Sequence, residues 1–224
     1  MPQLTQIKET KKGRMALFFD GEFAFSLDAD TFAKADLHEE DLLEEWQIED
    51  LRKQSDTRRA LDKAMDYLSL RDHAAGELYQ KLCRKFDEHS AAYAVARAGE
   101  LGLLNDADFA RRRAAELLRK RKSRREILLD LTAKGIDRDT AAEAVEALYA
   151  EADDGEDPEL VNARALVERH YAAKLAAGKR DQVAAALARR GFSHSVIRAA
   201  LAEETPVEAA PVEAAPVEEA PAQP

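Results

Sequence analysis

The sequence has little of what disulfide-rich, sheet-rich or membrane proteins depend on. Its 224 residues include one cysteine, Cys83, nine glycines and only 6% aromatic residues. A lone cysteine cannot form an internal disulfide, which favours a reducing compartment, so we expect a cytoplasmic protein. The apolar run 15–19 ends at Asp20 and is far too short for a signal peptide or a membrane span.

Scarce aromatics and glycine, together with abundant alanine and 35% charged residues, favour helix over a large sheet. The only strand pattern lies at the N-terminus, where Leu4–Lys8, Arg14–Phe19 and Glu22–Leu27 are candidate strands and Asp20-Gly21 is a tight-turn dipeptide. We expect residues 1–56 to form a hairpin region with a helix from His38 onward. Its predicted apolar stripe contains Leu42, Leu43, Trp46 and Leu51.

A pattern then recurs three times. An apolar residue is followed by a leucine four positions later, a cation three later, and then a glycine or a phenylalanine. The three copies are Leu78, Leu82, Lys85, Phe86; Ile127, Leu131, Lys134, Gly135; and Val183, Leu187, Arg190, Gly191. A helical run precedes and follows each copy. The sequence therefore predicts a mainly α protein of three tandem three-helix repeats, at 57–105, 106–150 and 159–204, stacked in an elongated curved array.

Two acidic segments lie outside the repeats. Residues 151–158 read as a linker between the second and third repeats. Residues 205–224 have a proline every five positions, at 206, 211, 216 and 221, and proline at that period is incompatible with a helix. We therefore expect a disordered acidic tail there.

No catalytic pattern is visible in the sequence. The five histidines have no metal-ligand spacing with Cys83 or with each other, and Ser193-His194-Ser195 are neighbours that cannot form a convergent relay. Asp28-Ala29-Asp30 lacks the later ligands of a calcium loop, and no glycine-rich phosphate loop occurs. We expect a binding protein without cofactor, metal or catalytic residues.

One short stretch is strongly basic although the whole chain has a net charge of -10. Residues 111–125 hold nine basic residues and one acid, Glu116. On a helix over 108–122, the basic residues at 111, 112, 119 and 122 share an arc opposite an apolar face. Glu116 is placed to pair with Arg112 and Lys120, and the other cations are predicted to lack a local partner.

That arc has two interpretations, a solvated helix face or a contact surface for an acidic partner. The unpaired arginines favour the contact surface, because the planar guanidinium binds carboxylates and phosphates bidentately. The candidate partner-binding residues are Arg111, Arg112, Arg119, Lys120, Lys122, Arg124 and Arg125.

Three groups of residues form a recognisable set: the junction 102–110 (GLLNDADFA), the first-repeat residues Leu70-Arg71, Glu77-Leu78, Lys81-Leu82 and Lys85, and the turn Lys134-Gly135-Ile136. Together they resemble the RecX family, bacterial regulators of the RecA recombinase. The resemblance covers about residues 5–203. Ala74 stands where the family usually has a serine, so we expect Asp72 to provide that helix cap. Phe86 replaces a usual glycine, and Lys179 a usual serine.

The resemblance implies a non-enzymatic, monomeric regulator that binds the RecA filament, along its groove and near the single-stranded DNA inside it. Such a protein lowers ATPase activity, strand exchange and filament growth in DNA repair, homologous recombination and the SOS response, with no role for a membrane. Two alternatives are a general helical DNA-binding protein and a scaffold for an unrelated partner.

Overall fold

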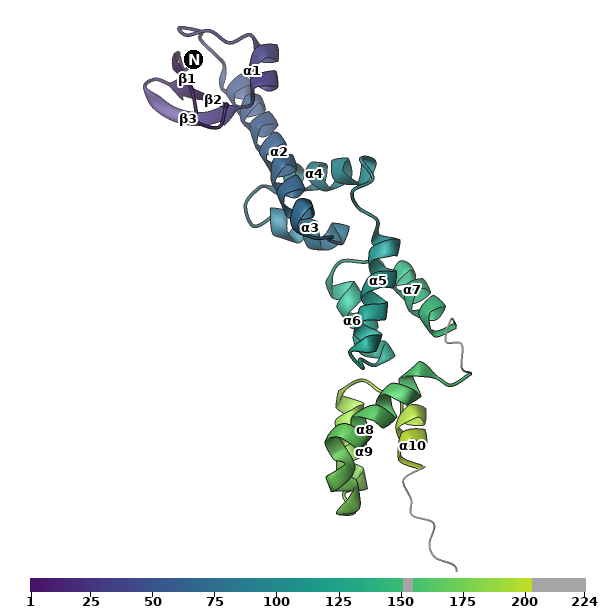
Figure 1. Ribbon diagram of the computed structural model, residues 1–224. Helices are drawn as coiled ribbons and strands as arrows, with labels where there is room; N and C mark the ends of the chain where they lie inside the picture. The colour runs from purple at the N-terminus through teal and green to yellow at the C-terminus, as the bar shows by residue number, and fades with distance from the viewer. Residues whose placement is uncertain (151–154, 203–224) are drawn as a thin grey trace, which may run out of the picture.

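The chain forms a small sheet followed by helical units that extend away from it (Figure 1). The computed structural model describes residues 1–150 and 155–202. The predicted disorder of 205–224 and part of the predicted linker 151–158 lie outside the described residues. Within them, the predicted tandem three-helix architecture and the N-terminal sheet are confirmed.

The sheet is antiparallel, in the order β1 (Leu4–Glu9), β2 (Met15–Phe19) and β3 (Glu22–Leu27). Asp20 and Gly21 connect β2 to β3 with φ of 50° and 86°, the left-handed pair that a two-residue hairpin turn needs. A short helix that the sequence did not suggest, α1 (Ala29–Ala35), covers the sheet together with the start of the next helix. Asp28 is its N-cap rather than a cation ligand, and accepts a hydrogen bond from the Thr31 amide at 3.1 Å.

Helix α2 (Glu45–Leu70) begins later than the predicted start at His38 and continues past the predicted boundary at residue 56. It begins at residue 45, because residues 38–43 instead run beside the N-terminal strand, with the Leu4 amide bonded to the Asp41 carbonyl at 2.8 Å. The predicted stripe is therefore partly wrong. Leu43 and Leu51 are buried, whereas Leu42 and Trp46 are 59% and 70% exposed.

The predicted boundary between residues 56 and 57 falls inside α2, which continues from the sheet into the first repeat (Figure 1). Arg14 fastens the sheet to the middle of this helix. Its guanidinium donates to the Ser26 carbonyl at 2.6 Å and to the Ser55 hydroxyl at 3.2 Å, and Ser55 also donates to the Ser26 carbonyl at 2.6 Å. The sheet and the first repeat thus share one continuous element.

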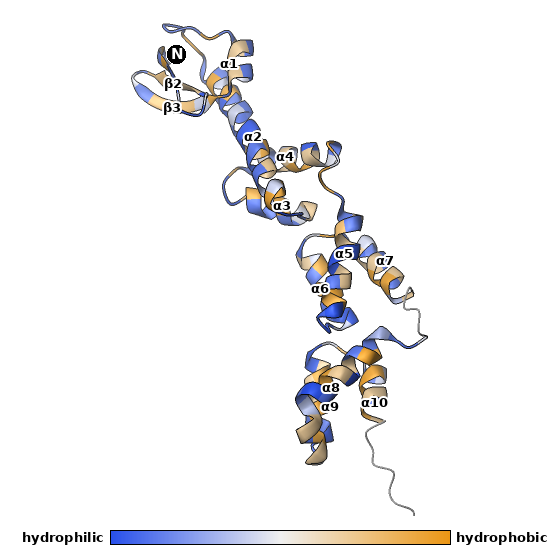
Figure 2. Cartoon of the chain, in the orientation of Figure 1, coloured by the Kyte–Doolittle hydropathy of each residue, from blue (hydrophilic) through white to orange (hydrophobic). Residues whose placement is uncertain are grey.

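The three repeats have the same plan. Repeat 1 is the C-terminal half of α2 with α3 (Ala75–Leu82) and α4 (Glu88–Glu100), repeat 2 is α5 (Asp106–Arg119), α6 (Arg124–Ala133) and α7 (Arg138–Ala150), and repeat 3 is α8 (Pro158–Ala176), α9 (Arg180–Arg189) and α10 (His194–Ala202). In each repeat the first and third helices pack against each other, and polar and apolar residues alternate along the helices (Figure 2). All six apolar residues of the recurring pattern are fully buried: Leu78, Leu82, Ile127, Leu131, Val183 and Leu187.

Successive repeats meet through the N-terminus of a middle helix. At the joint between repeats 1 and 2, the Ala75 amide at the start of α3 donates to the carboxylate of Asp106 in α5, at 2.9 Å. At the joint between repeats 2 and 3, the Arg124 amide at the start of α6 donates to the carboxylate of Glu159 in α8, at 3.1 Å. The expected cap from Asp72 is therefore wrong. The next repeat provides a carboxylate because α3 has no side-chain cap of its own.

A glycine turn completes each joint. Gly135, which follows α6, approaches Gly76 in α3 so closely that a Cβ on either residue would lie 2.6 Å from the other's Cα. Gly191, which follows α9, lies against Ser123, whose hydroxyl donates to the Arg190 carbonyl at 2.7 Å. The residue after the recurring cation is thus a glycine wherever a preceding repeat packs on it.

Candidate partner-binding surface

Helix α5 carries the first half of the basic stretch. Asn105 caps it by accepting from the Asp108 amide at 3.0 Å. Its apolar face, which includes Phe109 and Leu117, is buried in the core of repeat 2. Arg111 and Arg112 lie on the opposite, exposed side, as the helical arc predicted.

The helix ends at Arg119, three residues earlier than the predicted arc required. The Arg121 amide bonds to the Leu118 carbonyl at 2.8 Å and the Lys122 amide to the Leu117 carbonyl at 3.1 Å, which is the Schellman closure of a helix. Arg121 has a φ of 58° there. Lys122 therefore does not share an arc with Arg111, because the chain leaves the helix before it.

The prediction that most of the cations lack a partner is wrong. Six of the nine basic residues of 111–125 form ion pairs, and Glu116 pairs with Arg113 instead of Arg112. The pairs are Arg111 with Asp108 at 3.7 Å, Arg112 with Asp108 at 3.0 Å and with Asp72, Arg113 with Asp130 and Glu116 at 2.8 Å, Lys120 with Glu116 at 2.5 Å, Lys122 with Glu126 at 3.2 Å, and Arg124 with Glu146 at 3.3 Å.

Arg113 connects two helices of repeat 2. Its guanidinium donates to both carboxylate oxygens of Asp130 in α6, at 2.8 and 2.9 Å. This bidentate pair lowers the pKa of Asp130 and raises that of Arg113. The hydrogen bonds from Lys120 and Arg113 hold the pKa of Glu116 at about 2. Arg113 is therefore committed to the internal structure of the repeat.

A second charged cluster lies at the joint between repeats 1 and 2, around Glu77. Its carboxylate contacts Arg71 at 2.6 Å, His73 at 3.3 Å, Lys81 at 3.8 Å and Lys134 of repeat 2 at 3.6 Å. Burial alone would raise the pKa of Glu77, but the hydrogen bond from Arg71 and the charge of Lys134 hold it at about 2. Glu77, one of the residues that carry the first-repeat resemblance, thus links the two repeats through Lys134, and Arg71 and Lys81 contact its carboxylate from within repeat 1.

Three arginines of the basic stretch have no ion pair with any described residue: Arg119, Arg121 and Arg125. Arg121 and Arg125 each lie two residues from Ser123, whose hydroxyl donates to the Arg190 carbonyl across the joint between repeats 2 and 3. Arg125 also lies against Gly191, since a Cβ on that glycine would be 3.2 Å from the Arg125 Cβ.

Repeat 3 adds two arginines to this place that sequence reasoning missed. Arg189 and Arg190 are exposed and have no ion pair within the described residues. They lie at the end of α9, where repeat 2 packs against repeat 3. The one sequence signal that could have predicted this position is the equivalence of Gly135 and Gly191 in the repeat pattern, because it places the two joints in register. The end of α5 lies at the same joint, because the Leu118 carbonyl, next to Arg119, accepts a hydrogen bond from Asn162 of α8 at 3.0 Å. We call the five arginines on the segments that meet at this joint the joint surface: Arg119, Arg121, Arg125, Arg189 and Arg190.

Neither a metal site nor a membrane span emerges from the described part of the chain. Within residues 1–150 and 155–202, no three His, Cys, Asp or Glu side chains gather as metal ligands would. No helix in those ranges combines the length and the apolar character that crossing a bilayer requires.

Comparison with known proteins agrees with this architecture. Residues 60–97 match the model described as RecX, first three-helix domain, and residues 105–145 match RecX, second three-helix domain. Regulatory protein RecX of Bacillus licheniformis is 30% identical over 211 residues, covering 91% of this chain and 78% of the relative. Its counterpart in Bacillus subtilis is 29% identical over 208 residues, covering 90% and 76%.

Solved structures share the fold. A crystal structure of regulatory protein RecX matches with a TM-score of 0.62 at 21% identity, covering 88% of this chain and 97% of that one. RecX from Lactobacillus salivarius matches with a TM-score of 0.56 at 22% identity, covering 66% and 96%. The sequence identity over most of the chain and the two matched three-helix domains establish that this protein belongs to the RecX family of regulatory proteins.

Proposed function

We propose that this protein is a cytoplasmic, non-enzymatic regulator that binds a RecA–DNA filament as a monomer and lowers its ATPase activity, strand exchange and growth. Membership of the RecX family carries this proposal. The architecture supports it, because a row of repeats with bonded joints offers a long surface to a filament whose own subunits repeat.

The joint surface is the part of the protein that we expect to meet the filament most strongly. An arginine that already holds a carboxylate must exchange one ion pair for another when a partner binds, so its net gain is small. An arginine without an internal partner gains the full charge-assisted hydrogen bond. Of the seven residues that the sequence nominated, Arg119 and Arg125 have no ion pair with any described residue.

Arg121 adds a further argument. It occupies a left-handed backbone position, with φ of 58°, where glycine closes α4, α6, α8 and α9. A non-glycine residue in this conformation costs roughly 1 kcal/mol. Arg121 therefore lowers the stability of the fold, and its side chain forms no ion pair with any described residue in return. Such a cost is expected when the side chain binds a partner.

The test measures DNA-dependent ATP hydrolysis by the RecA of the same species. We expect the wild-type protein to lower it, and a variant with Arg119, Arg121 and Arg125 all changed to Gln to lose most of the effect at equal concentration. Three unmade charge contacts should weaken binding by several kcal/mol if they are buried in the complex. Helicity should stay normal, because Gln is a good helix former.

A control variant removes the same charge elsewhere. Arg84, Arg138 and Arg169 are exposed and have no ion pair within the described residues. Changing these three to Gln should leave inhibition close to wild type. No effect of the wild-type protein on RecA would refute the function, and equal inhibition by both triple variants would refute the role of the joint surface.

General DNA binding is the second candidate function, because the joint surface also suits phosphates. The net charge of -10 opposes strong binding to naked DNA. The affinity for naked duplex DNA, measured as a function of salt concentration, distinguishes the two functions. Direct binding to duplex DNA through the five arginines would have a log–log salt slope of roughly -4 to -5, since each phosphate contact contributes about -0.9.

A further inference from the structure

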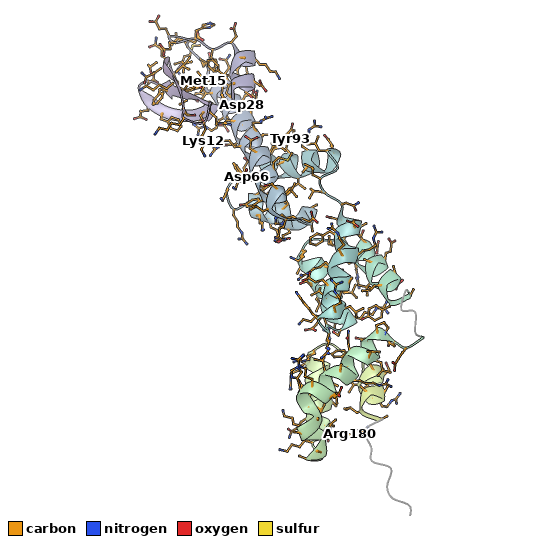
Figure 3. The ribbon with its side chains drawn as sticks, in the orientation of Figure 1. Lys12, Met15, Asp28, Asp66, Tyr93 and Arg180 are labelled. Carbon is orange, nitrogen blue, oxygen red and sulfur yellow. The ribbon has the colours of Figure 1, made fainter. Side chains whose placement is uncertain are left out.

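The last repeat has a groove between α9 and α10. Its floor is small and apolar, because α9 presents Ala184, Ala185 and Ala188 to it and α10 presents Ile197 and Leu201. Arg180 lies at the start of α9, at the end of the repeat farthest from repeat 2 (Figure 3). Arg198 and His194 of α10 line the same groove, and Asp181 is the only acid among its lining residues.

The start of α9 differs from the start of the other middle helices. In repeats 1 and 2, a carboxylate of the next repeat accepts a hydrogen bond from the first amide of the middle helix, Asp106 for Ala75 and Glu159 for Arg124. Among the described residues, none packs on repeat 3 at the start of α9 as the next repeat does at the other two joints. Lys179 provides no side-chain cap, and Arg180 beside it is exposed. Within the described residues, this joint face of the last repeat is uncovered.

A second copy of the chain is a poor fit for this face. To continue the array, repeat 1 of the second copy would need two features that repeats 2 and 3 have at their joints. These are an accessible N-terminus of its first helix and a glycine after its middle helix. In repeat 1 the first helix is the middle of α2, which runs uninterrupted from Glu45 to Leu70. The turn residue after Lys85 is Phe86 instead of glycine. Head-to-tail stacking therefore lacks both parts of the contact.

The acidic C-terminal segment fits it in position and charge. Residues 203–224 follow α10 in the sequence, and Leu201 near the end of α10 lines the groove. They contain six glutamates and no basic residue. Their valines and prolines are of a size to lie on a floor of alanines, and their glutamates complement Arg180 and Arg198.

The spacing of the glutamates matches the groove as well. Glu208 and Glu213 are five residues apart, and five residues of a polyproline-like chain would span about 16 Å. This span is close to the length of α9 along the groove, which is about 15 Å for its ten residues. The start of α9 and the start of α10 both line the groove, and a helix N-terminus attracts a carboxylate. The first turn of α10 contains no acidic residue of its own.

We propose that the acidic segment 205–224 binds back into the α9–α10 groove of its own chain and covers the open joint face of repeat 3. Its glutamates take the place of the carboxylate that a following repeat provides at the other joints. The segment thereby shields this face of repeat 3 from solvent, as a capping repeat does in other repeat proteins.

Hydrogen exchange followed by mass spectrometry tests this on three forms: the full chain, the chain ending after Glu204, and the full chain with Glu208, Glu213 and Glu218 changed to Gln. We expect amides of 180–188 to exchange about two- to fivefold faster in the second and third forms than in the first. Raising the salt concentration should have the same effect on the full chain. Exchange in α6 should be equal in all three.

A fourth form blocks the groove without removing the segment. Ala188 is exposed, so Ala188→Glu should fold normally while placing a negative charge on the groove floor. We expect it to exchange like the truncated chain. Equal exchange of 180–188 in the full and truncated chains would overturn the proposal, and protection that persists in the three-Gln form would overturn its electrostatic basis.

Discussion

Replacing Gly76 by alanine should weaken the joint between repeats 1 and 2 while improving the helix that carries it. Gly76 lies in α3 and its φ is not positive, so alanine suits its backbone. In an isolated helix the change would stabilise by up to about 1 kcal/mol. In this chain the new Cβ would lie 2.6 Å from the Cα of Gly135, where ordinary contact begins near 3.4 Å.

The magnitude follows from the neighbouring bonds. The new Cβ is bonded to the backbone of α3 and the Gly135 Cα is itself backbone, so neither atom can move away alone. The two repeats must therefore separate by about 0.8 Å, the difference between 3.4 and 2.6 Å. The hydrogen bond from Ala75 to Asp106, now 2.9 Å, would then exceed hydrogen-bond length. Losing a bond to a charged acceptor costs roughly 1.5–3 kcal/mol. We expect a net destabilisation of about 1–2 kcal/mol after the helix gain.

Gly99→Ala is the matched control, because Gly99 is also helical, in α4, and a Cβ there would meet nothing within 4 Å. Denaturant unfolding monitored by circular dichroism compares the two variants, and hydrogen exchange of the Ala75 amide localises the effect. The control should be equal to or slightly more stable than wild type. If Gly76→Ala matched it in both measurements, the close approach of the two glycines would not hold the joint together.

Three other changes probe separate features. Leu131→Ala should destabilise by roughly 2–4 kcal/mol, since Leu131 is fully buried in the core of repeat 2, and a denaturation shift below about 0.5 kcal/mol would contradict that burial. Arg121→Gly should stabilise by about 0.5–1 kcal/mol in the same assay, because glycine adopts a φ of 58° without strain. Burial raises the folded pKa of Glu159 above 4.5, so its protonation favours the folded state, and that stabilisation is complete below pH 4.5 and lost as pH rises through the folded pKa. The stability difference between wild type and Glu159→Gln should therefore change in favour of wild type as the pH falls from 7 to 4, and a constant difference over that whole range would show that Glu159 has no raised pKa.

The repeats were predictable from the sequence because they depend on local information. A buried pair such as Ile127 and Leu131 repeats at helical spacing, and a cation followed by glycine indicates a helix end. The three helices of each repeat therefore lie where the recurring pattern and its flanking helical runs predicted them. The hairpin was equally visible, since Asp20-Gly21 determines the turn and the residues on either side alternate.

What the sequence did not reveal depends on contacts between distant residues. Residues 38–43 have helical character, yet they pair with the N-terminal strand, because backbone hydrogen bonds to Leu4 are available there. The partners of the basic stretch were missed for the same reason. Arg112 contacts Asp72 forty positions away, and Arg113 contacts Asp130 on another helix, so no local count of charges identifies them.

These contacts change which residues should matter for the partner. The high density of positive charge made the whole of 111–125 a candidate contact surface. However, most of these cations form ion pairs within repeat 2 or between repeats 1 and 2. The arginines without an ion pair to any described residue belong to the joint surface, to which repeat 3 contributes Arg189 and Arg190. On our proposal that this surface contacts the partner, repeat 3 is needed to complete it. A partner that needs this surface would sense whether the joint is closed, since the contact between Ser123 and Arg190 positions the arginines on both of its sides.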